Sequence, residues 1–265
     1  MRISLFNNYG AKNSAPVFQA IAKGLLECGH SIVNHDNSAD VAVIWSMLWS
    51  GRMKGNREVY TAFRSHNKPV IVAEVGMINR NQTWKLGLNG TGFANYPTHI
   101  VDHNRAAKLG IQCREWRSSG SNIVIACQRT DSEQWSGQPA LQTWLETTIA
   151  MLRQHTDRPI VVRERNRSRT DRKINRVENA LGDVHALVTF NSVAATEAVL
   201  AGVPAFVLAP SNAAAPVASR DLSEIDTPYW PDDDKRYAWA CHLAYGQWHV
   251  REIQNGSAYR MLNES

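Results

Sequence analysis

The sequence lacks the features of a membrane-spanning or disulfide-stabilised protein. No apolar run approaches the roughly 18 residues that a membrane-spanning helix needs. Only four of the 265 residues are cysteine, and no two of them form a CxxC pair. The first residues enter a strand pattern directly, without the layout of a signal peptide. These absences predict reduced cysteines, no membrane span and a cytoplasmic location, which would be the host cytoplasm if the protein is viral.

Metal-binding patterns are scarce as well. The scattered cysteines offer no zinc spacing, and no DxD motif stands in a loop suited to a metal. Asp232, Asp233 and Asp234 form a run of carboxylates that is either a metal cluster or the solvated N-terminus of a helix. Because three successive carboxylates after a proline are typical of a helix N-terminus, we prefer that interpretation. We therefore expect no metal site and no required cofactor.

The residues that are present are typical of a globular protein with an anionic partner. Hydrophobic residues make up 43% of the chain and charged residues 20%, as in ordinary soluble domains. The formal net charge is +5. An excess of Lys and Arg attracts anions, so the candidate partners are a nucleotide, a nucleic acid or an acidic glycan.

Strand patterns alternate with helical patterns along the chain, which predicts an α/β fold with mostly parallel sheets. A stretch rich in Arg and Ser separates two such series. We therefore expect two Rossmann-like domains, residues 1–117 and 118–265, facing a central cleft, with the final helices packing back on the first domain. Within them, residues 79–95 are expected to form a loop over the cleft, and residues 235–253 one long helix.

The most informative stretch runs from Val188 to Val207 and reads as strand, tight turn, helix, glycine stop and strand. Asn191 and Ser192 are both suited to cap the helix. A helix N-terminus beyond the carboxyl end of a strand offers N–H groups to a phosphate. Glu197 stands about one turn into the helix, where its carboxylate could reach a ribose hydroxyl. The alternative is an ordinary βαβ unit with a capped helix.

Polar residues also follow other expected strands. Gln128 comes after one strand, and Arg163 and Arg165 come after another. Guanidinium groups bind phosphate bidentately, although part of this basic run must be solvated surface. Glu74 ends an expected strand of the first domain, where ligands bind in open α/β sheets; it is either a general base or a cap for a neighbouring helix. Asp102 is a second acid–base candidate, and its neighbour His103 would point to the opposite face of a strand.

These motifs resemble, in their order, the capsule-polysaccharide-type, GT-B-like glycosyltransferases, the group that includes bacterial Kdo transferases of capsule assembly. The resemblance rests on Trp45, Glu74-Val75-Gly76, the strand before Gln128 with Asp131-Ser132, Arg163, and Ser192 through Glu197 and Gly202 to Pro204. Two departures stand out: Val75 replaces the Asp of the family's motif, and Glu164-Arg165 replaces its Pro-His. The C-terminal segment resembles short stand-alone proteins of tailed bacteriophages.

The resemblance implies transfer of a sugar from a nucleotide sugar, with a UDP-sugar favoured and a CMP-sugar as the other option. The donor would bind the second domain, and Glu74 or Asp102 would act on the acceptor hydroxyl. The donor-binding residues would be Gln128, Arg163, Arg165, Asn191, Ser192 and Glu197. The acceptor side would comprise the first loop with Asn8 and Tyr9, the aromatic turn at Trp45, which could instead pack a domain edge, and the basic residues Arg52 and Lys54.

The basic charge and the phage-like form favour a hydroxymethylated pyrimidine in double-stranded phage DNA as the acceptor. The alternative is a transferase that acts on a surface or capsular polysaccharide. A second alternative is a non-catalytic nucleotide- or glycan-binding module, because Val75 stands where the family has an acidic residue.

Overall fold

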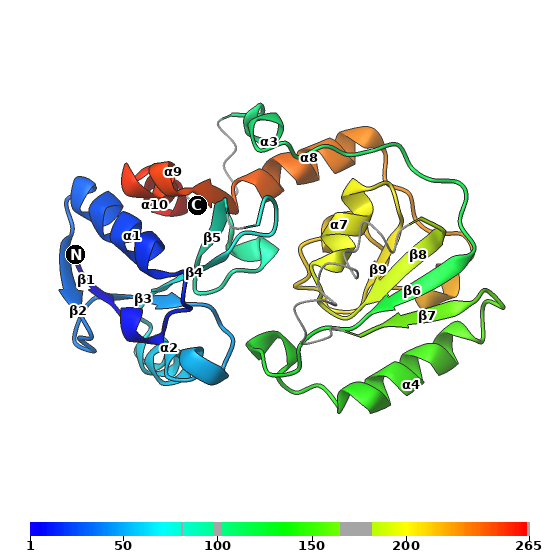
Figure 1. Ribbon diagram of the computed structural model, residues 1–265, viewed down its shortest axis with the longest axis horizontal. Helices are drawn as coiled ribbons and strands as arrows, with labels where there is room; N and C mark the ends of the chain where they lie inside the picture. Colours follow the sequence, from blue (N-terminus) through cyan, green and yellow to red (C-terminus); the bar gives the residue numbers. More distant parts are fainter. Residues whose placement is uncertain (81, 98–101, 165–181, 264–265) are drawn as a thin grey trace. The chain divides into compact units, whose positions relative to one another are not determined.

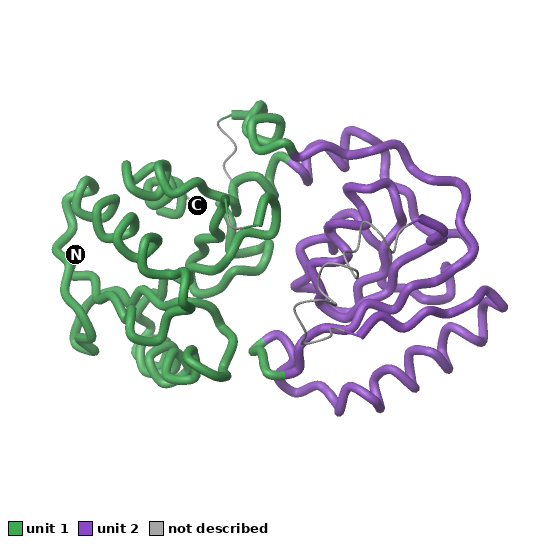
Figure 2. Tube along the Cα trace, viewed as in Figure 1, with its two compact units in different colours: residues 1–110, 131–133, 241–265 green, residues 111–130, 134–240 purple. Residues whose placement is uncertain are grey.

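The computed structural model describes residues 1–80, 82–97, 102–164 and 182–263 (Figure 1). The chain divides into two compact units (Figure 2). Unit 1 comprises residues 1–110, 131–133 and 241–265, and unit 2 comprises residues 111–130 and 134–240. Within the described residues, no helix is both long and apolar enough to cross a membrane.

Unit 1 is built on a six-stranded sheet. Four strands are parallel in the order β2-β1-β3-β4, and β5 and β10 continue the sheet beyond β4 through antiparallel pairing. The strands are β1 (Arg2–Leu5), β2 (Ser31–Asn34), β3 (Val41–Trp45), β4 (Val70–Val75), β5 (Thr83–Leu88) and β10 (Gln247–His249).

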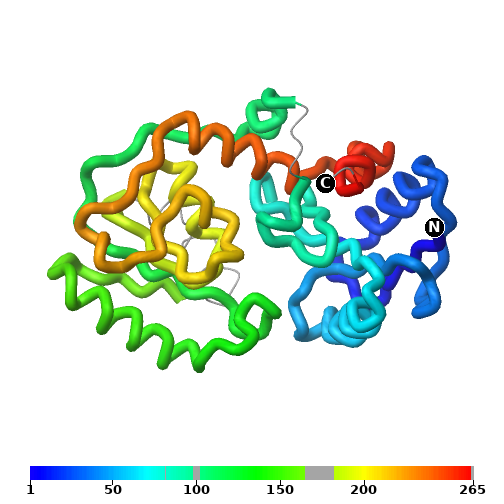
Figure 3. Tube along the Cα trace, turned by 180° about the vertical axis from the view of Figure 1, so that it is seen from behind, coloured from blue at the N-terminus to red at the C-terminus, as the bar shows by residue number. Residues whose placement is uncertain are grey.

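Helices cover both faces of this sheet, because its central strands bury side chains on both sides. Every residue of β3 is buried: Val43 and Trp45 belong to one apolar cluster, and Ala42 and Ile44 to another. The first cluster includes residues of α1, α9 and α10, which lie side by side in the views from both sides (Figures 1 and 3). The second includes residues of α2. The helices and 3-10 turns of unit 1 are η1 (Asn7–Tyr9), α1 (Ala15–Glu27), η2 (Gly51–Met53), α2 (Asn56–Ser65), η3 (Phe93–Asn95), α3 (Arg105–Lys108), α9 (Val250–Gln254) and α10 (Ser257–Asn263).

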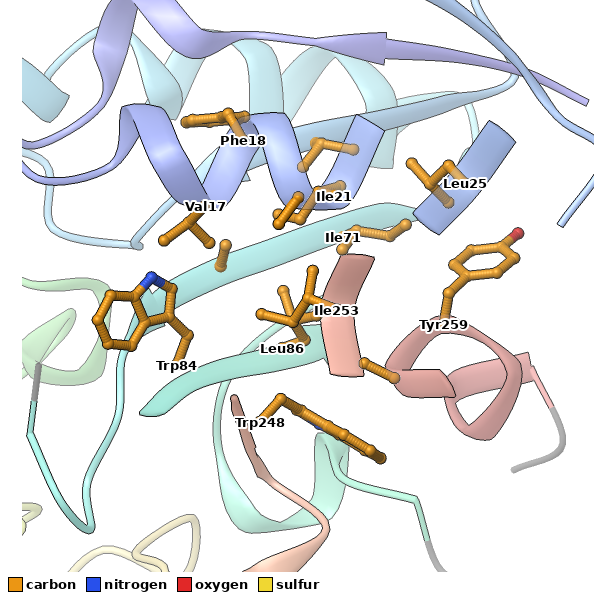
Figure 4. Packing of buried hydrophobic residues seen from close by; sticks show 14 of the residues in the cluster. Val17, Phe18, Ile21, Leu25, Ile71, Trp84, Leu86, Trp248, Ile253 and Tyr259 are labelled. Atoms are coloured by element: carbon orange, nitrogen blue, oxygen red, sulfur yellow. The ribbon is translucent and has the colours of Figure 1, made fainter. Parts of the chain in front are cut away.

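The C-terminal segment completes the apolar core of unit 1. Figure 4 shows Ile21 and Leu25 of α1 on one side of Ile71, with Ile253 and Tyr259 opposite. All five side chains are at least nine-tenths buried. At about 25 cal/mol per Å² of apolar surface, these contacts stabilise the docking of α9 and α10 on α1.

Unit 2 has a four-stranded, fully parallel sheet in the order β7-β6-β8-β9. Its strands are β6 (Asn122–Ala126), β7 (Ile160–Arg163), β8 (Val184–Thr189) and β9 (Ala205–Val207). The connecting helices are α4 (Leu141–Leu152) and α7 (Ala194–Leu200), and α8 (Asp233–Ala244) contains the boundary with unit 1. Short 3-10 turns are η4 (Glu133–Trp135), η5 (Ala215–Val217) and η6 (Leu222–Glu224).

The predicted α/β class with mostly parallel sheets is thus confirmed, and two local expectations are wrong. Residues 79–95 contain β5, which is almost entirely buried and pairs antiparallel with β4 on one side and β10 on the other. The helix expected over residues 235–253 ends at Ala244, and β10 follows it. Gly246 lies at this break, where the Tyr96 ring leaves no room for a side chain, since an added Cβ would lie 2.4 Å from that ring. The local residue pattern of neither segment predicts a strand. β5 forms because it pairs with β4, and β10 forms because it pairs with β5.

In unit 1, β2 lies on one side of β1 and the next strand in the chain, β3, lies on its other side. In unit 2, β7 and β8 flank β6 in the same way. The direction in which strands are added to the sheet therefore reverses between β1 and β3, and between β6 and β8. Loops leaving the carboxyl ends of two such strands diverge and leave a crevice, which is where ligands bind in open α/β sheets. The fold therefore indicates the ends of these two strand pairs as candidate sites.

Gly202 joins α7 to β9 in a way that no other residue permits. Its φ is +78°, and an added Cβ would lie 1.9 Å from the carbonyl oxygen of Glu115. The neighbouring backbone is tied there by hydrogen bonds from Arg114 N to Leu200 O (2.9 Å) and from Arg117 N to Gly202 O (2.8 Å).

We expect Gly202→Ala to lower the free energy of unfolding by at least about 2 kcal/mol, since the left-handed conformation and the backbone clash add. Gly137→Ala is the matched control: its φ is +75° with open space around the added Cβ, so it should cost only about 1 kcal/mol. Chemical denaturation measures both values. Equal losses for the two variants would contradict the close approach to Glu115.

Candidate functional site

The ends of β6 and β8 in unit 2 are joined by a side chain. Gln128 follows β6, is largely buried, and accepts a hydrogen bond at Oε1 from the backbone N–H of Asn191, which follows β8 (2.6 Å). The Asn191 side chain donates to Ser211 Oγ (2.9 Å). Two residues that the sequence placed 63 positions apart thus meet at the crevice of the parallel sheet.

Ser192 forms the turn that starts α7. Its N–H donates to Thr189 Oγ1 (3.3 Å), its Oγ accepts from Ala194 N (3.3 Å), and its carbonyl accepts from Asn212 Nδ2 (3.2 Å). The helix that follows has only seven residues, so its macrodipole is short. These bonds order the turn and already engage the N–H groups of Ser192 and Ala194.

Arg163 and Glu197 place opposite charges near the carboxyl ends of the strands of unit 2. Arg163 ends β7, and Glu197 lies in the first turn of α7. Burial lowers the pKa of the Arg163 guanidinium, and the Glu197 carboxylate opposes that shift. The two side chains are therefore within electrostatic reach of one another. Arg165, the other arginine predicted for this site, lies outside the described residues.

Cys127 directly follows β6, where its N–H donates to Arg163 O (3.0 Å), and its thiol has no reactive character. Burial, followed by the charge of Glu164, raises the pKa of its thiol to about 11. The thiol is consequently protonated at neutral pH and acts as a small apolar side chain.

The predicted residues Asn8, Tyr9 and Trp45 lie at or just after the ends of the two strands that border the corresponding crevice of unit 1. Asn8 and Tyr9 lie in η1 just after β1, and Trp45 ends β3. The Trp45 ring is 2% exposed and packs towards Phe18 of α1, 6.3 Å away between ring centroids. In this position the ring fills the core, and the crevice meets only the backbone at the end of β3.

Asn56, which the sequence did not single out, connects the two strand ends of this crevice. It is fully buried at the start of α2, and its Nδ2 donates to Tyr9 O (3.2 Å) and to Trp45 O (2.5 Å). A lone Asn after a glycine carries no signal in the sequence. Arg52 donates from Nε to Gly10 O (3.3 Å), which ties η2 to the same loop, and Lys54 is exposed directly after η2.

Glu74 lies near the carboxyl end of β4 and is paired across the sheet with Lys85 of β5. The Lys85 ammonium lies 2.6 Å from Glu74 Oε2, and Thr91 Oγ1 donates to the same oxygen (3.2 Å). Burial alone would raise the pKa of Glu74, but the charge and hydrogen bond of Lys85, with the Thr91 hydrogen bond, hold it below its ordinary value of 4.5. Glu74 is therefore ionised at neutral pH. Lys85 was not expected from the sequence, because residues 79–95 read as a loop.

Asp102 has a different setting. Its Oδ1 accepts from Asn104 N (2.9 Å), and its Oδ2 binds the Lys108 ammonium (2.7 Å). The hydrogen bond and ion pair with Lys108, followed by the Asn104 bond, outweigh burial and lower the pKa of Asp102. Both carboxylate oxygens thus serve the start and end of the short helix α3. No hydrogen bond or ion pair between Asp102 and Glu74 is found in the part of unit 1 that the structure describes.

Unit 1 also carries an open groove of about 620 Å³ beside β10. None of the acceptor-side residues predicted from the sequence lines it. Its lining residues are Gln82, Trp84, Arg105, Lys108, Leu109, His249, Val250, Arg251 and Glu252. Among the described residues, no group of three or more His, Cys, Asp and Glu side chains is placed to hold a metal ion.

The fold of the chain is similar to that of two transferases from Thermosulfurimonas dismutans. The first is KpsC, beta Kdo 2,4 transferase, with a TM-score of 0.54 and 11% identity over 99% of this chain and 98% of that one. The second is KpsC, beta Kdo 2,7 transferase, with a TM-score of 0.52 and 12% identity over 99% of each chain. At such identity the likeness concerns the fold, which is GT-B-like over nearly the full length. No protein-family model and no curated protein sequence matches the chain.

The Glu74–Lys85 pair can be tested by a double-mutant cycle. Glu74→Gln leaves a nearly buried ammonium without its counter-charge, and we expect it to cost about 2 kcal/mol of unfolding free energy. This is less than for a fully buried pair, because 34% of the Glu74 side chain is exposed. The double variant Glu74→Gln/Lys85→Met should lose less than the sum of the single variants. Additive losses would contradict the pairing.

The same pair predicts a pH dependence. Because the folded-state pKa of Glu74 is lowered, its stabilisation is fully present above the ordinary value of 4.5 and is lost as the pH falls through the lower folded-state value. Glu74→Gln should therefore show a smaller loss of stability on acidification in that range than the wild type. Denaturation curves at a series of pH values measure this, and parallel curves for the two proteins would refute it.

Proposed function

We propose that the protein is a nucleotide-sugar-dependent glycosyltransferase that transfers a sugar to a hydroxyl group of a saccharide. The observation that carries the proposal is the full-length likeness of fold to two Kdo transferases. It is supported by the polar residues at the β6 and β8 ends of unit 2, which lie where this class of sheet binds ligands. A fold alone does not define a reaction, so the site chemistry has to supply the rest.

In this proposal unit 2 binds the donor. Arg163 and the N–H groups after Ser192 contact the phosphate, and Glu197 holds a ribose hydroxyl while its carboxylate favours the charged form of Arg163. Gln128 acts by fixing the backbone at Asn191, because its Oε1 is already committed to that N–H. Arg165 remains a proposed second phosphate contact. The names of the two similar transferases make CMP-Kdo the first donor to test, and the UDP-sugar expected from the sequence is the second.

Unit 1 would act on the acceptor, with Glu74 as the proposed base in preference to Asp102, whose oxygens are both engaged by α3. In the overall transfer the acceptor oxygen bonds to the anomeric carbon, and its proton passes to the carboxylate. The bond from the anomeric carbon to the phosphate oxygen breaks, and the nucleotide leaves with the electron pair. Lys85 keeps Glu74 ionised, as a base must be, and lowers its basicity, so its main contribution is to orient the hydroxyl.

The saccharide acceptor is preferred to hydroxymethylated DNA. The two proteins of similar fold are Kdo transferases by name, whereas the DNA acceptor rests on the net charge of +5 and on the phage-like tail. Neither comparison points to DNA modification or to a phage form. Asn8, Tyr9, Arg52 and Lys54 remain proposed acceptor-side residues, and Trp45 would contribute through the backbone that Asn56 holds.

The proposal predicts turnover in a screen of donors and acceptors that measures nucleotide release. CMP-Kdo and a panel of UDP-sugars are each combined with oligosaccharides and with hydroxymethylated or unmodified duplex DNA. We expect release above donor hydrolysis only with a saccharide, and no salt-dependent binding to duplex DNA. Release that depends on hydroxymethylated DNA would contradict the acceptor. Nucleotide binding without release under any combination would instead favour a non-catalytic binding module.

The donor site is tested by binding of free CMP and UDP. Arg163→Gln and Glu197→Gln should each weaken nucleotide affinity by about tenfold, since each removes one charge-assisted contact. Arg220→Gln and Glu146→Gln are matched controls at exposed positions of the same unit and should leave affinity unchanged. Calorimetric titration measures all four variants. Wild-type affinity in both site variants would rule out this donor site.

A further inference from the structure

Unit 2 exposes aromatic side chains in a segment that the donor site does not use. Tyr229 and Trp230 are 40% and 43% exposed and follow one another just before the carboxylates at the start of α8. Tyr237, one residue after Arg236 in α8, is also exposed. Large aromatic side chains left in water together lose the free energy of burial, so a surface of this kind indicates a binding partner.

Buried and half-buried residues hold the Trp230 ring in a fixed position. Trp230 stacks on Trp116, with ring centroids 6.3 Å apart and an interplanar angle of 23°. The guanidinium of Arg236, which is 1% exposed, lies 4.1 Å from the centre of the Trp116 ring and donates to the carbonyl of Arg114. Trp116 Nε1 donates to Pro231 O (3.0 Å). The outer ring is thus held in place before any ligand arrives, which reduces the entropy lost on binding.

Tyr229 is held as well. The Lys235 ammonium donates to its hydroxyl (2.9 Å) and lies 5.2 Å from the ring centre. Lys235 is in turn fixed by its N–H, which donates to Asp232 Oδ1 (2.7 Å). We refer to Trp116, Tyr229 and Trp230 as the aromatic platform.

Two kinds of polymer stack on aromatic rings: nucleic acids through their bases, and saccharides through the C–H face of the sugar ring. The charges beside the platform distinguish them. Asp232, Asp233 and Asp234 follow it directly. The Asp233 carboxylate is 94% exposed and lies 3.7 Å from the buried Arg236 guanidinium, and the Lys235 ammonium lies against Tyr229, so three carboxylates stand beside two cations. Phosphates or many sugar carboxylates would meet these like charges, whereas sugar hydroxyls can donate hydrogen bonds to the same oxygens.

We propose that the aromatic platform binds a saccharide chain of low charge, with Trp230 stacking on a sugar ring and the neighbouring carboxylates accepting hydroxyl hydrogen bonds. The inference rests on the proposed function for the identity of its occupant and deepens it. The platform would bind a saccharide of the class that the proposed reaction uses as its acceptor. The acidic run that the sequence alone presented as a helix terminus would then have a second role at the rim of a glycan site.

The test is a binding measurement without donor, by calorimetry and tryptophan fluorescence, on the full chain. The probes are maltoheptaose, cellohexaose and laminarihexaose as neutral chains, oligogalacturonate as an acidic chain, and single-stranded oligothymidine. We expect at least one neutral chain to bind at up to millimolar concentrations, and to bind more tightly than the acidic chain or the DNA.

Trp230→Ala should weaken that binding by roughly fivefold to tenfold, and Trp230→Phe should retain most of it. Met151→Ala, which removes a 46% exposed apolar side chain from α4 of the same unit, is the matched control and should have no effect. Thermal unfolding of each variant establishes that it is folded. Tyr229→Phe keeps the stacking ring if Trp230→Ala fails to fold, and it should bind the neutral chain nearly as the wild type does, whereas Tyr229→Ala should not.

Three results would overturn the proposal: no binding of any neutral chain, equal binding by Trp230→Ala and Met151→Ala, or Trp230-dependent binding of the DNA or the acidic chain in preference to the neutral ones. Since no donor or turnover is involved, such a result leaves the proposed transferase reaction standing. Conversely, Trp230-dependent glycan binding by a protein that transfers no sugar would count against the reaction and not against the platform.

Discussion

The hydrogen bond from the Asn191 N–H to Gln128 Oε1 is the interaction on which the candidate donor site depends. It joins the carboxyl ends of β6 and β8, the two strands between which a doubly wound sheet opens its crevice. The bond is made by a largely buried amide, where a lost hydrogen bond would leave polar groups unsatisfied. The turn at Ser192, and with it the start of α7 that carries Glu197, therefore has a defined position relative to β6.

In unit 1 a different residue, Asn56, holds the backbone beside the crevice. There the η1 turn that follows β1 and the end of β3 are joined by the buried amide of Asn56, which donates to the backbone carbonyls of Tyr9 and Trp45. Both units thus use a neutral side-chain amide to hold the backbone beside a crevice, and leave charged groups at its periphery. Charges near such a site are tuned by partners: Lys85 lowers the pKa of Glu74, and Glu197 opposes the effect of burial on Arg163.

Local patterns of apolar residues predict many of the strands and helices of the fold. Apolar runs such as those at Val41 and Ile123 mark strands buried on two faces, and α1 and α4 follow their helical spacing closely. The strand β5 and the short edge strand β10 carry no such local pattern. Their residues form strands because β4 and β5 offer unpaired backbone edges to them, and pairing partners far away in the chain cannot be seen in a window of neighbouring residues.

The sequence by itself determined the α/β class and the succession of strands and helices, and it brought Gln128, Asn191 and Glu197 into one hypothesis, because polar residues after apolar strands mark the ligand side of a parallel sheet. Only the tertiary structure decided which contacts those residues make. It turned the Trp45 ring into the core, placed Lys85 against Glu74, and gave Asn56 and the Trp116–Trp230 stack their positions. Each of these depends on residues distant in the chain meeting at one place, and a lone Asn, Lys or Trp carries no local signal of its eventual partner.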